Sequence, residues 1–391
     1  MRFFRYATML LFLVLLAACG PGTPEKTAAP PPPTIQPEDT ISPETPTMVP
    51  TEAPYPVPTG EFFYYGLRER LGEGYADLGV FRFDLKTSEL EKIAPEGWNL
   101  QDVSPNGSRL LINQGSQLYT VYLDGSGSRM ISGQLYDYGT RGAAWNTDGS
   151  GIVFVLSGVS GTVLVRSNPD GSELEELGSP GDSPIEIEGI TPGGDVFWQK
   201  GTCSDQGVCS REGSYRTTAE TAGSSQPLEG MDRLKLSPDG SRIAYAFEND
   251  QGKSSLGVAA SDLSSKTAIA LPGDLLGDFS WSPDGVRIAA VRLDRSDYSG
   301  RVSGTRNFVV DTKSGSTREF AESEGLLGRV LFSPDGSKLL LWSTIQKVDG
   351  YEVVMNFLDL APESLSRLPD SDNLNNSNFP LLTNSYWKKN K

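Results

Sequence analysis

The 391-residue chain has no histidine and only three cysteines. Without imidazole it has no Ser-His-Asp or Cys-His nucleophile pair and no histidine ligand for a metal ion. Basic residues are also scarce: 34 Lys and Arg stand against 50 Asp and Glu, for a net charge of −16. Because phosphate binding needs a basic surface, this balance argues against nucleic acid as a partner. The sequence has no Gly-x-Ser-x-Gly elbow and no phosphate-binding or dinucleotide-binding glycine motif, so we expect no enzyme activity and no cofactor.

The first twenty residues have the features of an export signal. Arg2 and Arg5 precede an apolar run from Ala7 to Ala18, which is too short for a permanent membrane-spanning helix. The run leads into the sequence Leu16-Ala17-Ala18-Cys19-Gly20. This sequence resembles the lipobox of bacterial lipoproteins. The resemblance implies a signal peptide over residues 1–18, cleavage before Cys19, and attachment of palmitate-type acyl chains to Cys19. An ordinary signal peptide that happens to contain a cysteine is the alternative.

Proline and threonine dominate the next segment, which includes the runs Pro30-Pro31-Pro32-Pro33 and Pro54-Tyr55-Pro56-Val57-Pro58. Such a composition cannot bury enough apolar surface to fold, and it favours extended polyproline II. We therefore divide the chain into a signal peptide (1–18), a lipidated N-terminus with a stalk (19–60) and a folded domain (61–391). A lipid anchor at Cys19 would hold this domain outside the cytoplasm, at the cell membrane or cell surface.

A four-residue turn motif recurs six times in the folded domain, at intervals of 42 to 51 residues. The six turns are Ser104-Pro105-Asn106-Gly107, Asn146-Thr147-Asp148-Gly149, Thr191-Pro192-Gly193-Gly194, Ser237-Pro238-Asp239-Gly240, Ser282-Pro283-Asp284-Gly285 and Ser333-Pro334-Asp335-Gly336. Ser or Asn caps such a turn at its first position, Pro presets φ at the second, and Gly ends it. Each turn is followed by an apolar segment, for example Ile152–Val155. Such segments are typical of buried strands. Periods of this length indicate a solenoid or a propeller.

A second turn marker lies between these motifs, as in Leu123-Asp124-Gly125, and indicates the outer hairpin of a four-stranded blade. Six such units and an incomplete N-terminal unit, with strands over 61–66, 78–84 and 89–93, give seven blades. The missing fourth strand is expected near Phe379–Trp387, and about 47 residues per blade then match the period. We predict an all-β fold, a β-propeller of seven four-stranded blades. Six blades are the alternative, because Pro380 weakens the last strand.

The repeated Ser-Pro-Asp-Gly turn with its apolar strand resembles the TolB-like (WD-repeat-like) β-propeller repeat, also found beside prolyl oligopeptidase catalytic domains. The resemblance covers residues 61–387, and three of the six turns match it fully. It implies the fold but says little about activity. We expect neither the N-terminal α/β domain of TolB nor a C-terminal hydrolase domain in this sequence.

Cys203 and Cys209 lie on either side of a short loop, and in an exported protein this spacing favours a disulfide. Two thiols without histidine do not suit zinc. The acidic pairs Asp294 with Asp297 and Asp370 with Asp372 could contact Ca²⁺, but neither has the full spacing of a calcium loop. We therefore assign no metal site.

One face of such a propeller is the better candidate for binding. If the strands of each blade run A to D from the centre outward, the A–B and C–D turns lie on one face, and the B–C and D–A connections lie on the other. The B–C loops are expected to vary, over 67–77, 201–213, 248–253, 294–304 and 345–351. Variable loops on a rigid scaffold concentrate recognition, with Trp, Tyr and Arg as frequent anchors. We predict a partner-binding face that includes Arg68, Arg70, Trp98, Tyr136, Tyr138, Arg141, Tyr298, Arg301 and Tyr351.

Three functions remain open from the sequence. The first is a membrane-anchored, monomeric propeller that binds a protein or glycan partner without catalysis. The second is a propeller-type polysaccharide lyase or hydrolase, because paired carboxylates can perform acid–base chemistry without histidine. Two carboxylates about 5–10 Å apart in the central channel would favour the enzyme. The third is a structural role in an envelope complex.

Overall fold

The computed structural model describes residues 60–71, 74–136, 141–158, 161–181, 185–203, 209–218, 225–272, 275–295, 302–320, 326–347, 350–367 and 380–390. These ranges belong to the unit Pro54–Lys391. Their regular secondary structure is β-strand, and they contain no helix long and apolar enough to cross a membrane. The predicted signal peptide, Cys19 and the stalk lie outside the described residues, so the lipid anchor stays a prediction.

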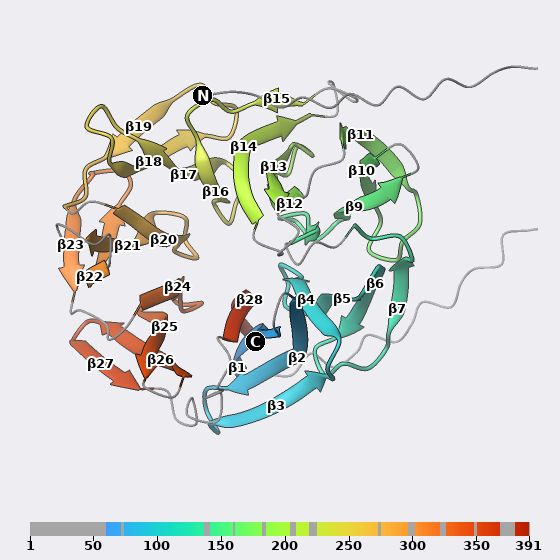
Figure 1. Cartoon of the computed structure of the whole chain (residues 1–391), viewed down its shortest axis with the longest axis horizontal. Helices are drawn as coiled ribbons and strands as arrows, with labels where there is room; N and C mark the ends of the chain where they lie inside the picture. The colour runs from blue at the N-terminus through green and yellow to red at the C-terminus, as the bar shows by residue number, and fades with distance from the viewer. Residues whose placement is uncertain are drawn as a thin grey trace, which may run out of the picture. The chain divides into compact units, whose positions relative to one another are not determined.

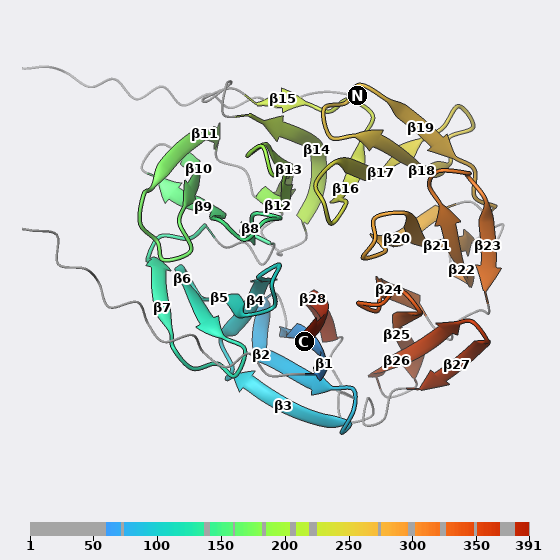
Figure 2. The same cartoon turned by 180° about the vertical axis from the view of Figure 1, so that it is seen from behind.

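Within these ranges, 28 strands form seven antiparallel sheets of four, arranged as blades around a ring (Figures 1 and 2). From the centre outward, blade 1 comprises β28 (Pro380–Asn390), β1 (Gly60–Leu71), β2 (Gly74–Asp84) and β3 (Glu89–Ala94). Blades 2 and 3 comprise β4 (Trp98–Val103), β5 (Arg109–Gln114), β6 (Gln117–Tyr122) and β7 (Arg129–Ser132), then β8 (Ala143–Trp145), β9 (Ile152–Gly158), β10 (Gly161–Ser167) and β11 (Glu175–Gly181). Blades 4 and 5 comprise β12 (Ile185–Ile190), β13 (Val196–Cys203), β14 (Cys209–Thr217) and β15 (Gln226–Pro227), then β16 (Asp232–Leu236), β17 (Arg242–Glu248), β18 (Ser254–Ala260) and β19 (Lys266–Ile269). Blades 6 and 7 comprise β20 (Leu275–Trp281), β21 (Arg287–Arg295), β22 (Val302–Asp311) and β23 (Thr317–Phe320), then β24 (Leu326–Phe332), β25 (Lys338–Lys347), β26 (Gly350–Leu360) and β27 (Glu363–Arg367). The predicted seven-bladed propeller is confirmed, and the six-bladed alternative is excluded.

The C-terminal strand closes the ring. β28 is the inner strand of blade 1 and pairs with β1, where Tyr64 and Tyr386 are Cα partners. Pro380 occupies the first position of β28, opposite Glu69, which is one of the few strand positions that tolerate proline. The Tyr386 hydroxyl also donates a hydrogen bond to the backbone oxygen of Gln101 in blade 2, at 2.9 Å. The predicted closing strand is therefore present, and it contacts the next blade directly.

The recurring turn has the hydrogen bonds that its sequence implies. In blade 5, Ser237 Oγ donates to Asp239 Oδ1 at 2.6 Å and accepts the N–H of Arg242 at 2.9 Å. Gly240 adopts a φ of +68°, a conformation that favours glycine, and its N–H donates to Ser237 O. The same serine contacts recur in the turns of blades 6 and 7. The bond from Ser237 is the largest cause that lowers the pKa of Asp239, because it stabilises the carboxylate form.

Neighbouring blades contact each other on the face that carries these turns. The Arg242 guanidinium crosses to blade 6, lies over the Trp281 ring at 5.1 Å, and donates to the backbone oxygen of Gly285. Gly240 lies so close to the preceding turn that a Cβ atom there would be 2.5 Å from Pro192 Cδ. The residues that repeat in sequence are thus the ones that join neighbouring blades.

Apolar side chains pack in the spaces between adjacent blades. One cluster joins blades 3 and 4 through buried residues that include Val153, Ile187 and Trp198. The Trp198 ring stacks on Tyr215 with centroids 4.5 Å apart, which adds an aromatic contact within blade 4. Each blade therefore uses one sheet face toward each neighbour, as the apolar strands after the turns predict.

Candidate binding groove

The opposite face of the ring carries the B–C connections, and the B strands reach this face to different extents. The B strand starts five residues after the first residue of the turn in blades 4, 5 and 6, and it contains 8, 7 and 9 residues respectively. At about 3.3 Å per residue, β21 of blade 6 extends about 7 Å farther than β17 of blade 5. Blade 5 is therefore lower than both of its neighbours on this face.

The strands shorten four of the five expected loops. In 201–213 they pair as far as Cys203 and Cys209, and in 345–351 they pair as far as Lys347 and Gly350. The segment 67–77 is largely strand, because β1 continues to Leu71 and β2 begins at Gly74. The segment 294–304 is likewise shortened by β21 and β22, which pair as far as Arg295 and Val302. Arginine, glutamate and glycine made these stretches look like loops, but the ladder of backbone hydrogen bonds continues through them. The B–C connections of blades 1, 6 and 7 are thus two-stranded ribbons.

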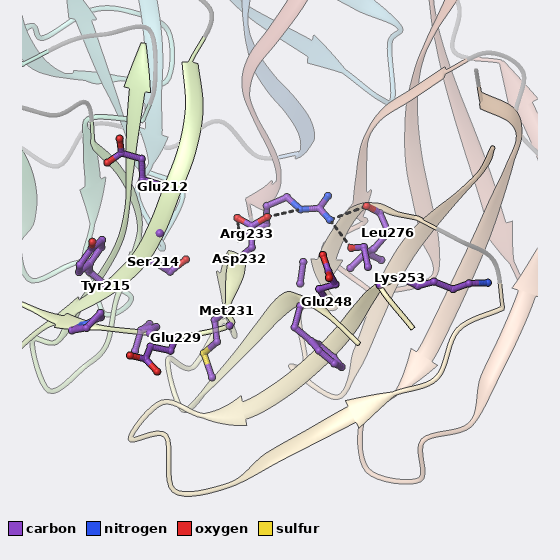
Figure 3. Close-up of a pocket in the computed structure, with 18 of the residues that line it drawn as sticks. Glu212, Ser214, Tyr215, Glu229, Met231, Asp232, Arg233, Glu248, Lys253 and Leu276 are labelled. Carbon is purple, nitrogen blue, oxygen red and sulfur yellow. Dashed lines mark hydrogen bonds and ion pairs between the residues drawn. The ribbon is translucent and has the colours of Figure 1, made fainter. Parts of the chain in front are cut away.

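A groove of about 1280 Å³ lies over the lower blade 5. One wall comes from β14 in blade 4, including Ser214 and Tyr215, and the floor comes from the connection into β16, including Met231 and Arg233. The end of β17 and the start of β20 in blade 6 line the other side, where Figure 3 shows Glu248 and Leu276. Three blades therefore form one groove on the face predicted to bind a partner.

Acidic groups outnumber basic groups in the groove. The carboxylates that line it are Glu212, Glu229, Asp232 and Glu248, against the cations Arg233 and Lys253. Arg233 is held at the floor, because its guanidinium donates to the backbone oxygens of Leu276, at 2.8 Å, and Gly277. Its backbone has a φ of +46°, which is uncommon for a residue with a side chain and is found more often at functional sites. The groove thus has a fixed cation at its floor and carboxylates around it.

The inner strands carry a second group of charged residues, which joins blades 2 to 5. Arg141 forms an ion pair with Asp102 at 2.6 Å and donates to the backbone oxygen of Glu188 at 3.1 Å. The Glu188 carboxylate lies 3.4 Å from Lys235 of blade 5. Asp102 also accepts the N–H of Trp145 at 2.8 Å. Both carboxylates are buried, and each has a basic partner.

Burial and charge set the protonation of this inner group. Burial lowers the pKa of Arg141, but the Asp102 carboxylate, followed by smaller contributions, raises it more, so the guanidinium stays charged. Burial raises the pKa of Tyr386 well above its ordinary value, although Arg141 opposes the shift. Tyr386 therefore keeps the proton that it donates to Gln101. These charges act as fixed contacts between blades.

Three of the nine residues predicted for the binding face have described side chains. Trp98 is partly buried and packs against Tyr119 at 5.2 Å, and Tyr136 packs on the cluster between blades 3 and 4. Arg141 belongs to the inner charged group. None of these three residues lines the groove.

The other six predicted residues are placed only in part. Tyr138, Tyr298 and Arg301 lie outside the described residues. For Arg68, Arg70 and Tyr351 the structure gives the backbone alone, in the ribbons of blades 1 and 7. Their role on this face stays a prediction.

The residues of the disulfide and calcium predictions also lie wholly or partly outside the described residues. The ladder of β13 and β14 makes Cys203 and Cys209 Cα partners, but their side chains lie outside the described residues, so the disulfide stays a prediction. Asp297, Asp370 and Asp372 also lie outside, as does the side chain of Asp294. Among the described residues, no group of three or more His, Cys, Asp or Glu side chains could hold a metal ion.

None of the nine residues predicted for the binding face lines the groove as the structure describes it. The residues predicted from the sequence were Trp, Tyr and Arg in connections, whereas Ser214 and Arg233 lie in strands and Glu229 lies in the turn between β15 and β16. One available signal was the short connection 248–253 in blade 5, flanked by longer ones in blades 4 and 6. A blade whose B–C connection is shorter than those of its neighbours should lie lower on this face of the ring, and a groove should then lie over it.

The chain matches no protein-family model and no protein of curated function. Solved structures that resemble it are β-propellers. They include an oligogalacturonate lyase from Vibrio parahaemolyticus, at 14% identity and a TM-score of 0.51, with 74% of this chain and 89% of that chain covered. The β-propeller domain of the Trilobed protease from Pyrococcus furiosus has 13% identity and a TM-score of 0.51, with 81% and 94% covered. A putative TolB from Agrobacterium tumefaciens has 13% identity and a TM-score of 0.42, with 84% and 98% covered.

At these identities the likeness shows the fold alone. The Pyrococcus furiosus domain has an open velcro topology. In this chain β28 pairs with β1, so the ring is closed by strands from both ends of the propeller. The fold therefore defines a closed seven-bladed β-propeller.

Proposed function

We propose that this chain is a lipid-anchored, extracytoplasmic binding protein that captures a protein or glycan partner on the groove-bearing face of its propeller. The lipobox-like sequence around Cys19 supports the anchor, and the Pro-rich segment after it supports presentation away from the membrane. No catalysis is part of the proposal.

The observation that carries the proposal is the groove over blade 5. On the face with the repeated turns, polar groups such as Arg242 contact neighbouring blades, and the pocket formed by the turns of blade 3 has a volume of only about 500 Å³. The other face instead has ribbons of unequal length and a groove of about 1280 Å³. This volume exceeds that of most small-molecule pockets, and the groove is lined by groups from three blades. It suits a segment of a larger partner.

The inner charged group favours binding over the lyase or hydrolase alternative. A catalytic acid and base need carboxylates that can exchange protons with a substrate. Asp102 and Glu188 instead pair with Arg141 and Lys235, and Asp102 also accepts backbone hydrogen bonds. These contacts fit a structural role for both carboxylates.

A capture experiment from native membranes tests the proposal. The mature lipoprotein should retain a partner through crosslinking and washing. Glu229→Lys, in the groove, should reduce the yield at least tenfold, whereas Glu173→Lys, an exposed residue in the C–D turn of blade 3, should leave it unchanged. Equal yields from both variants, or turnover of a polysaccharide by the purified protein, would contradict the proposal.

The anchor has its own test. Growth with labelled palmitate should label the wild-type chain and leave Cys19→Ala unlabelled, with the altered protein absent from washed membranes. A Cys19→Ala chain that stays in the membrane fraction would show that another segment holds it there.

A further inference from the structure

Two buried polar side chains lie side by side in blade 4, one in the wall of the groove and the other directly next to it. Gln199 of β13 and Ser214 of β14 are Cα partners in the ladder, so their side chains lie on the same face of the sheet. Gln199 is 2% exposed and Ser214 is 3% exposed. Among the described residues, the side-chain amide nitrogen and oxygen of Gln199 have no hydrogen-bond partner, and the hydroxyl of Ser214 has none either.

This polar pair faces blade 5. Phe197 lies two residues before Gln199 on β13, and it packs in the cluster that joins blades 4 and 5, with Leu228 and Met231. Because side chains two residues apart share a face of a strand, Gln199 points the same way. Ser214 itself lines the groove, and Figure 3 shows its hydroxyl turned from the β14 wall toward the opposite side. Ser214 therefore lines the groove, and Gln199 lies beside it on the same face of the blade 4 sheet, just beyond this apolar cluster.

The pair presents both kinds of hydrogen-bonding group. Gln199 Nε2 is a donor, Gln199 Oε1 is an acceptor, and Ser214 Oγ can be either. Buried polar groups in proteins are nearly always hydrogen-bonded, because each unpaired group forfeits its bonds to water. A ligand that satisfies this pair must bring a donor and an acceptor together.

We propose that the groove over blade 5 binds an extended, basic segment of a protein partner. This inference rests on the proposed binding function and specifies its ligand. A peptide backbone supplies the N–H and C=O groups that Gln199 and Ser214 lack, and Lys or Arg side chains complement the carboxylates of Glu229 and Glu248. A metal ion or a polyamine offers no acceptor for Gln199 Nε2, and an acidic polymer is repelled by the carboxylates.

Binding of simple peptides by the full mature chain tests this inference. The probe is a fluorescein-labelled decapeptide of alternating Lys and Gly, with Ser-Gly and Glu-Gly decapeptides as comparisons, measured by anisotropy at two salt concentrations. The Lys-Gly peptide should bind, more weakly at high salt, and the Glu-Gly peptide should not. Glu229→Lys and Glu248→Lys should each weaken binding about tenfold.

Asp250→Lys provides the matched control for charge. Asp250 is exposed in the same connection of blade 5 as Glu248 but does not line the groove, so the same change in charge should alter binding less than twofold. The double variant Gln199→Leu with Ser214→Ala removes the polar pair without leaving a buried group unpaired. It should unfold at the same or a higher temperature, yet bind the Lys-Gly peptide about fivefold more weakly.

Three results would overturn the inference. An equal loss from Asp250→Lys would mean that the peptide responds only to the net negative charge. Unchanged binding by the Gln199→Leu, Ser214→Ala chain would remove the polar pair from the site. Displacement of the native partner by a neutral oligosaccharide, but not by the Lys-Gly peptide, would assign the groove to a glycan. In that case the proposed binding function stands and only its ligand changes.

Discussion

Replacing Arg141 with methionine (Arg141→Met) should weaken the contact that joins the closing strand to its neighbours. Arg141 pairs with Asp102 at 2.6 Å, donates to Glu188 O at 3.1 Å, and lies over the Tyr386 ring at 5.8 Å. Methionine keeps much of the apolar length but has no charge and no donor. The change therefore leaves the Asp102 carboxylate buried without its cation.

The expected loss follows from this burial. The Asp102 side chain is 6% exposed, and removing one partner of a buried ion pair costs about 3–5 kcal/mol. Asp102 keeps the hydrogen bond from the N–H of Trp145, which places the estimate near the lower end, at about 3 kcal/mol. Combining Arg141→Met with Asp102→Asn should restore at least half of the loss, because no unpaired charge is then buried.

Urea unfolding of the unlipidated chain, followed by tryptophan fluorescence, measures these differences. Arg166→Met is the matched control, since Arg166 and Glu175 form a more exposed ion pair with side-chain exposures of 35% and 51%. It should cost less than about 1 kcal/mol. Equal losses of unfolding free energy in Arg141→Met and Arg166→Met would refute the reasoning. A larger loss in the Arg141→Met, Asp102→Asn double variant than in Arg141→Met alone would also refute it.

Three further predictions concern the turns and the cysteines. Gly240→Ala should destabilise the chain by at least about 1 kcal/mol more than Gly252→Ala. Both glycines have a positive φ, but only a Cβ atom at position 240 would collide with a neighbouring turn. Equal losses of stability in thermal unfolding would contradict this. The pKa of Asp239 is lowered in the folded state, so its carboxylate stabilises the fold fully above about pH 5 and loses this effect as the pH falls through the folded pKa. Asp239→Asn should therefore reduce the slope of the free energy of unfolding against pH below about pH 4. An unchanged slope would contradict this. The intact mature chain should weigh two hydrogen atoms less than its reduced form if Cys203 and Cys209 form the predicted disulfide, and labelling of both thiols without a reductant would rule it out.

The repeat made the architecture predictable because its information is local. Each Ser-Pro-Asp-Gly turn contains its own cap, its own φ restriction and its own glycine, as Ser237, Asp239 and Gly240 show. Counting these turns yields the blades, and a first blade with three strands requires a fourth from elsewhere. That reasoning led to the strand around Pro380, which the structure places as β28.

The groove could not be predicted in the same way because it arises from differences between blades. Its lining comes from β14, from the connection into β16 and from the end of β17, which are separated in sequence. The sequence does not show that Gln199 and Ser214 meet across a ladder or that their polar atoms lack partners. Choosing exposed aromatic and basic residues also favoured Arg141, which the fold uses inside the ring.

Site-specific photo-crosslinking in native membranes tests the central claim most directly. One chain would carry the photoreactive residue at Glu229, in the groove, and a second at Val286, a 40% exposed residue directly after a repeated turn on the opposite face. The account predicts a crosslinked protein partner from position 229 and none from position 286. Crosslinks from position 286 alone, or equal crosslinks from both positions, would contradict it.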